Sequence, residues 1–462
     1  SPRQSASGRP FLAREWLPEL RRTANPRLSA LLQAAQSDLQ GAAEYAARKH
    51  PEVAAWNLLG LGYLHNVIPG GESSLQRKLL AHCVDELHGE IRARLLKSDA
   101  LSLALFGRWK EAIAQLDRGL EQSISAGLRA ECEISRAACV CLAGSPDDAM
   151  AILEAVDRQA CDAASDAIWW NNRALVLEAS QRWQEANEAY ERALALCEDL
   201  GNAHYGAKVR HNIGCIHAHC GRQEQAYEAF STAAAEFERT GHKWTLLLSL
   251  NTLGGCAVEL GRYDEAQAAL QRALAFSAVA GNPVLEGQLL TKLGNMHRLQ
   301  GRPDEALSHH TRALDRYRVA ESPLSAVLAQ LNIGADRIQT DPEHSQADLM
   351  AAHKLARELN HPRAVAGAQG MLALHDALHA PAALAASLAR ATHSAGQSQS
   401  PECVALVAVV RGLEQHRRGE VDRAQDTLDG VAEATRSFQL VRWAAQLLRD
   451  TLGPVTPPSP QG

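Results

Sequence analysis

Aromatic residues and basic charge are both scarce in this chain of 462 residues. Phe, Trp and Tyr together make up 5%, and the formal net charge is −6 at pH 7. A protein that binds nucleic acid needs a basic face for the phosphates, so this balance argues against such a ligand. No apolar run approaches the roughly 20 residues of a membrane-spanning helix, and the first residues, SPRQSASGRPF, lack the apolar stretch of a signal peptide. We therefore expect a cytoplasmic protein that binds neither nucleic acid nor a membrane.

The sequence also lacks the short patterns that accompany common catalytic chemistry. It contains no GxxxxGK[ST] loop, no GxSxG elbow and no HExxH pair. Its ten cysteines form no CxxC pair and lie mostly inside apolar runs, which is typical of free thiols in a reducing compartment. We expect no enzyme activity, no cofactor and no metal. An all-helical enzyme without a familiar pattern is the least favoured alternative.

A fixed repeat period dominates what the chain does contain. Four glycines lie at equal intervals within short apolar runs: Gly214, Gly254, Gly294 and Gly334. Alanines follow the first three glycines at two constant offsets: Ala226 and Ala233, Ala266 and Ala273, Ala306 and Ala313. A repeat with a period of about 40 residues indicates stacked supersecondary units, each of which buries its apolar face against its neighbours.

Residues 206–241 show what one unit contains. An apolar stripe at positions i, i+4, i+7 and i+11 predicts a helix that ends at Gly221. A second stripe, which includes Phe230, predicts another helix that ends at Gly241. Gly201 and Gly281 close the neighbouring units, and we expect these closing glycines to adopt the left-handed conformation. Each unit is therefore a helix, a tight turn and a second helix.

These residues resemble the tetratricopeptide repeat family. Its pattern is N-x-G-x(6)-G-R-x-x-E-A-x(6)-A-[LA], and its small residues lie where the two helices of a repeat meet. Residues 172–196, 253–276 and 293–317 are strong matches. The period exceeds the common one of about 34 residues and is similar to that of kinesin light chains and of the LGN-type spindle adaptors. The resemblance implies an all-α, right-handed solenoid of about nine to ten helical hairpins.

The pattern continues more weakly on both sides of the central repeats. Alanines extend the series at Ala112, Ala149 and Ala186, and then at Ala347, Ala383 and Ala424. We expect a disordered tail over residues 1–10 and a Pro-rich disordered tail over 451–462. Between them we expect capping helices and a degenerate repeat over 11–94, the regular array over 95–320, and divergent repeats over 321–450.

The resemblance also implies a ligand-binding face. In this family, ligand contacts come mainly from a few positions of the first helix of each repeat, which line a concave groove. The residues chosen for such a role are Asn171, Asn172, Lys208, His211, Asn212, Asn251, Lys292, Asn295, Arg298 and Asn332. In kinesin light chains, the asparagine that matches Asn172, Asn212 and Asn332 contacts the backbone of an extended peptide. The alternative is that these amides, which both donate and accept hydrogen bonds, bridge adjacent helices of the scaffold.

The charged residues narrow the expected ligand. The central repeats lack the lysines and arginines of the carboxylate clamp that chaperone adaptors use, so a C-terminal chaperone tail is not expected. Lys208, Lys292 and Arg298 add positive charge to the expected groove and favour a mildly acidic peptide.

The remaining polar residues are expected to be structural. His211, Cys215 and His219 share one helical stripe, but its ends are too far apart for a single zinc ion. His309 and His310 are expected on the surface. The basic residue after each turn is expected to pair with an acidic neighbour on the outer surface, at Arg108, Arg182, Arg222, Arg262 and Arg302.

The favoured function is a protein-interaction module that binds a peptide segment of a partner, as an adaptor or scaffold does. The alternative is the sensor or regulatory part of a larger bacterial signalling or transcription-regulating protein. Self-association stays open. The identity of the partner does not follow from the sequence.

Overall fold

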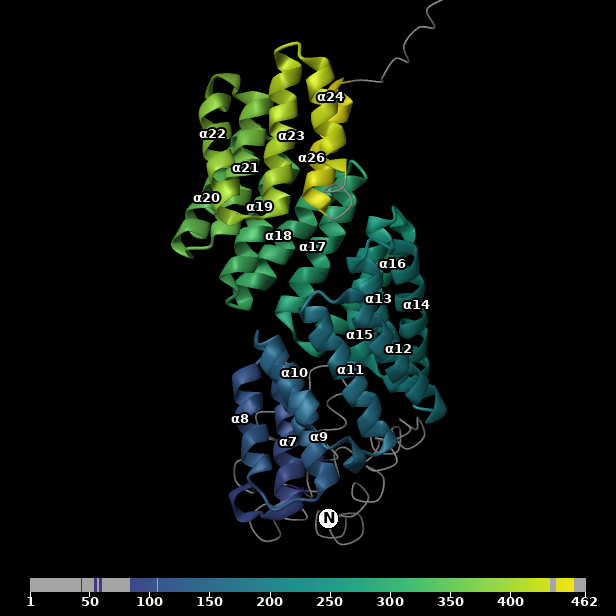
Figure 1. Cartoon of the computed structure of the whole chain (residues 1–462). Helices are drawn as coiled ribbons and strands as arrows, with labels where there is room; N and C mark the ends of the chain where they lie inside the picture. The colour runs from purple at the N-terminus through teal and green to yellow at the C-terminus, as the bar shows by residue number, and fades with distance from the viewer. Residues whose placement is uncertain are drawn as a thin grey trace, which may run out of the picture. The chain divides into compact units, whose positions relative to one another are not determined.

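The computed structural model describes residues 84–105, 107–432 and 438–452, together with positions 43, 54–55 and 58–59. Within this part, the chain forms 19 α-helices and no strand, which confirms the prediction of an all-α repeat array (Figure 1). The expectations for residues 1–10, for most of 11–83 and for 453–462 fall outside the described residues. In the part that the structure describes, no helix combines the length and the apolar character needed to cross a bilayer.

The chain divides into two compact units, and the boundary runs through one helical hairpin. Unit 1 comprises Ser1–Cys256 and Val279–Gly281, and unit 2 comprises Ala257–Ala278 and Asn282–Gly462. The described helices up to this boundary are η1 (Val84–Glu86), α7 (Gly89–Leu105), α8 (Trp109–Leu120), α9 (Ala126–Leu142), α10 (Pro146–Ala155), η2 (Arg158–Ala160), α11 (Ala163–Ala179), α12 (Trp183–Asp199), α13 (Ala203–His219), α14 (Gln223–Thr240) and α15 (Lys243–Glu259).

Unit 2 continues the same alternation of helices. Its helices are α16 (Tyr263–Ala280), α17 (Pro283–Leu299), α18 (Pro303–Val319), α19 (Pro323–Arg337), α20 (Pro342–Glu358), α21 (Pro362–His379), α22 (Pro381–Ser398), α23 (Pro401–Arg417), α24 (Val421–Gly430) and α26 (Gln439–Leu452). We call the first helix of each hairpin an A helix and the second a B helix. Within each unit, an A helix packs against its own B helix and against an A helix of the next hairpin, as α21 does with α22 and α23.

Short turns with defined backbone geometry separate the helices. Gly221 has φ +73° between α13 and α14, and Gly241 has φ +75° after α14, so the predicted breaks are confirmed. At the start of α13, the side chain of Asn202 accepts a hydrogen bond from the backbone N–H of Tyr205. This cap satisfies one of the donors that a helix leaves unpaired in its first turn.

Proline begins seven consecutive helices of unit 2. Each helix from α17 to α23 has proline at its first residue, and the prolines follow one another at nearly equal intervals from Pro283 to Pro401. Proline suits this place because its fixed φ fits a helix and its missing N–H would have no partner there. The repeat period is therefore built from two halves of nearly equal length.

Small residues allow the A and B helices of one hairpin to touch. Ala226, Ala266 and Ala306 are fully buried, as are the alanines seven residues after them. A Cβ atom added at Gly214 would lie 2.7 Å from the ring of Phe230, and one added at Gly334 would lie 2.6 Å from Leu349. The close approach predicted from the glycine period is confirmed, because no larger residue fits at these crossings.

The sequence pattern predicted the wrong buried position for two alanines of the C-terminal series. Ala347 and Ala383 are exposed, whereas Ser345 and Leu384 lie at the buried positions of α20 and α22. In α20, the hydroxyl of Ser345 donates to the carbonyl oxygen of Gly334 in α19 at 2.7 Å.

A connection shorter by one residue explains part of the shift at Ala347. Fewer residues separate Gly334 from the first residue of α20 than separate Gly294 from the first residue of α18. The buried position of α20 therefore lies one residue nearer to its glycine than in α18, at Ser345, and Ala347 lies two residues beyond it. At Ala424 the offset from Gly412 holds, and Ala424 is buried.

The expected ion pairs at the start of the B helices are present at three of the five arginines. Arg108 pairs with Glu111 and Arg182 with Glu185, each at 2.5 Å, and the same spacing recurs for Arg262. These pairs are exposed, so we expect each to contribute under about 1 kcal/mol.

The other two arginines depart from this arrangement. Arg222 has glutamine, Gln225, at the position where the others have glutamate. Arg302 is followed by Glu305 at the usual spacing, but its side chain donates to that of Gln300 instead.

We predict that Gly334→Ala destabilises unit 2 by about 1–3 kcal/mol, because the new methyl group meets the buried side chain of Leu349. Urea unfolding followed by circular dichroism measures the change. The matched control is Gly396→Ala in α22, where an added Cβ meets no atom within 4 Å and alanine is the better helix former. Equal stability of the two variants would contradict the packing described here.

Candidate functional site

An asparagine ladder joins three consecutive A helices of unit 1. Asn172 of α11 donates to the backbone oxygen of Ile134 in α9 at 3.0 Å. Asn171 donates to the side-chain oxygen of Asn172 at 3.1 Å, and Asn212 of α13 donates to that of Asn171 at 3.0 Å. The three amides therefore run head to tail across the A helices of neighbouring hairpins.

The members of the ladder differ in exposure. Asn172 is 7% exposed and holds α9 to α11, which is the helix-bridging role that the sequence left as an alternative. Asn171 and Asn212 are half-buried. Each of these two amides donates one N–H within the ladder, and a primary amide carries two N–H donors. Asn171 and Asn212 thus keep donors that solvent or a ligand can reach.

The other unit 1 candidates lie on α13 and α15. Lys208 is exposed, although the surrounding protein lowers the pKa of its ammonium group by desolvation. His211 is half-buried, shares a hydrogen bond of 3.0 Å with the hydroxyl of Ser249, and has its pKa lowered by burial to about 4, so it is neutral at pH 7. Asn251 of α15 is also half-buried. Within the described ranges, no group of three or more His, Cys, Asp and Glu side chains could hold a metal.

Two stacked histidines lie where α13 begins and α14 ends. The rings of His204 and His242 are 3.6 Å apart between centroids, and among the described residues neither Nδ1 has a hydrogen-bond partner. His242 is 2% exposed, and burial lowers its pKa to about 4, with a smaller contribution from Lys208. Burial also lowers the pKa of His204, assisted by His242 and Lys208. This pair was not singled out in the sequence.

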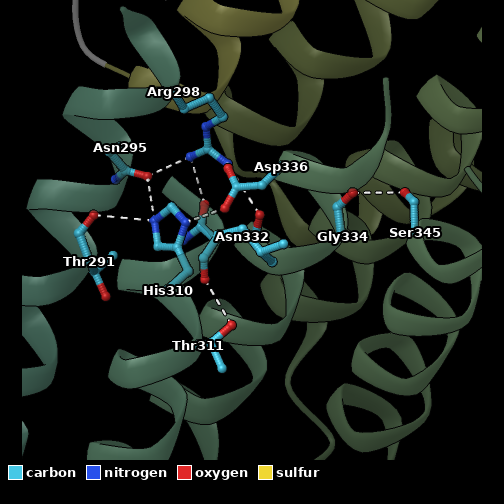
Figure 2. Close-up of polar contacts among 10 residues, drawn as sticks. Thr291, Asn295, Arg298, His310, Thr311, Asn332, Gly334, Asp336 and Ser345 are labelled. Atoms are coloured by element: carbon cyan, nitrogen blue, oxygen red, sulfur yellow. Dashed lines mark hydrogen bonds and ion pairs between the residues drawn. The ribbon is translucent and has the colours of Figure 1, made fainter. Parts of the chain in front are cut away.

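A buried charged network occupies the matching region of unit 2. Figure 2 shows side chains of α17, α18 and α19 pointing toward one another around Arg298. The guanidinium donates to Asn295, to Asn332 at 2.8 Å and to Asp336 at 3.4 Å. Arg298 is 4% exposed. Three of the four unit 2 candidates, Asn295, Arg298 and Asn332, are thus brought together, but around a buried cation.

His310 completes the network and corrects the expectation that it lies on the surface. Its side chain is fully buried, and its Nδ1 lies 2.5 Å from the Asp336 carboxylate. At the same place in the preceding B helices the chain has Tyr190, Phe230 and Leu270. His310 therefore occupies a core position, and its imidazole is tolerated there because Asp336 and the oxygen of Asn295 at 3.2 Å provide partners.

A sequence signal for this network exists in hindsight. Asp336 also stands where the preceding repeats have apolar residues, namely Cys256 and Met296. Two neighbouring core positions thus change from apolar to ionisable in the same hairpin pair. Lys292, the fourth unit 2 candidate, is half-buried on α17, and burial lowers the pKa of its ammonium group to about 8.

Comparison with protein families identifies the central part of the chain. The tetratricopeptide repeat model matches residues 165–235, 207–278 and 244–318. These residues are tetratricopeptide repeats. No curated protein sequence matches the chain. The family match includes the asparagine ladder from Asn171 to Asn212 and the α17 and α18 members of the charged network, whereas Asn332 and Asp336 follow it.

Solved structures share the tetratricopeptide fold at low sequence identity. The apo form of RapI has a TM-score of 0.61 and 9% identity, over 74% of this chain and 97% of that chain. The apo form of the quorum sensor NprR from B. thuringiensis has a TM-score of 0.53 and 13% sequence identity, over 78% of this chain and 98% of that chain. A third similar structure is a signal transduction ATPase with numerous domains and a tetratricopeptide repeat sensor, from Pyrococcus horikoshii. Its TM-score is 0.53 and its sequence identity is 14%. That match covers 71% of this chain and 51% of the ATPase, so the chain spans about half its length.

Acid should destabilise the repeats through His242. An unfolded chain binds a proton at histidine near pH 6.5, whereas the folded protein does so only near pH 4, so the free energy of unfolding falls as the pH drops between these values. His242→Asn, which places there the residue found at Asn202 and Asn282, should lose less melting temperature than the wild type between about pH 7.5 and about pH 5. The control is His88→Asn, at an exposed histidine. An unchanged pH dependence in His242→Asn would refute this assignment.

Removing the charge of Asp336 should strongly destabilise the repeats of unit 2. Asp336→Asn keeps the side-chain shape but leaves Arg298 as an uncompensated buried cation, so we expect a loss of about 3–5 kcal/mol in urea unfolding. Asp315→Asn removes an exposed carboxylate 3.7 Å from Arg318 and should cost under about 1 kcal/mol. Similar losses of stability in both variants would show that the charge of Asp336 does not stabilise the buried network.

Proposed function

We propose that this protein is a peptide-binding interaction module whose binding surface is the A-helix face of unit 1. The observation that carries the proposal is the asparagine ladder, in which Asn171 and Asn212 are fixed in one orientation and remain half-buried. Amides held in this way can pair with the backbone of an extended peptide whatever its side chains are. Because the ladder pre-orders them, binding costs little side-chain entropy.

The remaining hydrogen-bonding groups of the ladder fit a peptide backbone. Asn212 uses one N–H in the ladder, which leaves its second N–H and its carbonyl oxygen for a ligand. One peptide unit offers the complementary carbonyl oxygen and N–H. Asn172 is excluded from this role because it is buried and bonded to α9. The proposed contacts are therefore Asn171 and Asn212, with Asn251 one hairpin further on.

Two exposed side chains at the same position of successive repeats, Lys208 and Leu248, suggest which side chains a peptide would carry. Lys208, one helical turn before Asn212, is exposed and favours an acidic residue. Leu248 of α15 is a large apolar side chain with 36% of its surface exposed and favours an apolar residue. We infer a ligand that combines an acidic and an apolar residue in an extended segment.

The same surface would serve an adaptor or a sensor. The long repeat period favours an adaptor of the kinesin light chain or LGN type. The likeness to a quorum sensor and to the sensor-bearing ATPase favours the regulatory alternative, in which a further domain of the same protein responds to the bound peptide. The complete gene separates the two readings, because only the sensor requires a DNA-binding or ATPase domain.

Asn212→Ala should weaken peptide binding by about 0.5–1.5 kcal/mol, the net worth of an ordinary hydrogen bond. The probe is a set of labelled peptides selected from a random library on the wild-type protein, and fluorescence anisotropy gives their affinities. The melting temperature should hold or rise, since alanine is the better helix former.

Asn187→Ala is the matched control for this experiment. Asn187 is a half-buried asparagine on the B helix α12, and among the described residues its side chain bonds only to Glu191 of the same helix. This variant should bind the selected peptides as the wild type does. Full binding by Asn212→Ala, together with a lower melting temperature, would assign the whole ladder to the scaffold and withdraw the proposal.

A further inference from the structure

The last described helix, α26, stacks on the array as one more A helix. A Cβ added at Gly412 of α23 would lie 2.6 Å from Leu448 of α26. The preceding step is equivalent, because a Cβ at Gly370 of α21 would lie 2.8 Å from Leu406 of α23. Both pairs have the same separation in the sequence. One side of α26 is therefore an ordinary continuation of the repeats.

A second side of α26 contacts residues far away in the sequence but within the same unit. Arg442 forms a salt bridge of 2.5 Å with Glu259, at the C-terminal end of α15, and also donates to the backbone oxygen of Glu259 at 3.4 Å. Gln439 donates to the same carboxylate at 2.7 Å. The two charged side chains are 22% and 16% exposed, so water screens their attraction less than that of a surface pair.

The same side of α26 covers the charged network of unit 2. The guanidinium of Arg298 lies over the ring of Trp443, 5.4 Å from its centroid. Helices α17 and α26 are in contact. The tryptophan ring thus occupies a place beside Arg298, one of the residues that the sequence assigned to ligand binding. In unit 2, a side chain of α26 therefore packs against a residue that the sequence had assigned to ligand binding.

We propose that α26 is a displaceable internal ligand, and that unit 2 binds a partner helix of the same chemistry when α26 leaves. Such a helix carries an arginine for Glu259, followed directly by an aromatic residue for Arg298, and then two adjacent leucines, one helical turn after the aromatic residue, for the apolar surface of α23. These are the features of the sequence RWAAQLL at residues 442–448. The proposal extends the proposed function to a second surface but does not depend on the asparagine ladder.

The contacts of α26 are suited to release. It is 14 residues long, which is near the limit for a helix that is marginal alone in water, so it needs the surface beneath it. Its outer contacts include an ion pair, further hydrogen bonds and a cation–π contact, all made through Gln439, Arg442 and Trp443. Among the described residues, α26 packs against α17, α23 and α24. The apolar side of α26 joins the core of unit 2 through Val441, Ala444 and Leu448, so its release would expose the apolar surface of α23 to which a partner helix could bind.

The test uses a fluorescein-labelled peptide of residues 439–452 and the full chain. Arg442→Glu places two carboxylates against each other and should release α26 while leaving Glu259 and Arg298 in place. Apparent affinity scales with the fraction of molecules whose surface is free, so the peptide should bind this variant at least about 10-fold more tightly than the wild type. Hydrogen exchange should show faster exchange in α26 and unchanged exchange in α19–α22.

Two variants control for charge and for folding. Arg449→Glu reverses an exposed arginine on the same helix and should leave the peptide affinity at the wild-type value. Glu259→Arg combined with Arg442→Glu restores an opposite pair, so it should hold α26 closed and exclude the wild-type peptide again.

Two outcomes would overturn the proposal. One is equal peptide affinity and equal exchange of α26 in the wild type and in Arg442→Glu. The other is joint loss of protection in α19–α24, which would make α26 an integral part of the fold. Because Asn212→Ala does not touch this surface, it should change neither result. Failure of the ladder as a binding site is therefore distinguishable from failure of the internal ligand.

Discussion

The close crossing of two helices within each hairpin is the contact on which the rest of this structure depends. Glycine or alanine on the A helix lets the B helix approach until side chains of one touch the backbone of the other, as Gly334 and Leu349 do. Each hairpin gains dispersion contacts in this way and presents a regular surface to the next one. The spacing of the A helices, and with it the spacing of any residues that bridge them, follows from this crossing.

Polar residues between the A helices use that spacing in two different ways. In unit 1, neutral amides link α9, α11 and α13 while two of them remain within reach of solvent. In unit 2, Arg298, His310 and Asp336 place ionisable groups in the interior, where burial is costly unless each has a partner. The first arrangement leaves hydrogen-bonding capacity for a ligand. In the second arrangement, the bonds within the network occupy the hydrogen-bonding groups, and the guanidinium of Arg298 lies over the ring of Trp443.

Local pattern predicted the fold but not which candidate residues are exposed. Helix ends at Gly221 and Gly241 and the buried Ala226, Ala266 and Ala306 follow from the period, because each depends on residues within one hairpin. The position of Ala347 was wrong because it lies 13 residues after Gly334 instead of 12, and because a connection shorter by one residue moves the buried position to Ser345. Burial of Asn172, Arg298 and His310 depends on residues of other helices, which a periodic pattern does not encode. Substitution of an apolar core residue by His310, matched by Asp336 on the next A helix, was the one available clue.

The prolines that begin α17 to α23 have a consequence for how unit 2 recovers from partial opening. A proline cannot sit inside a helix without losing a hydrogen bond and meeting the preceding turn, at a cost of about 3 kcal/mol or more. Neighbouring helices therefore cannot merge, and none can slide along the chain by a turn. Proline therefore sets the residue at which each of these helices begins, whether or not its hairpin is docked. A detached hairpin therefore has to find the correct orientation on its neighbour, but its helices cannot dock in a register that is shifted along the sequence.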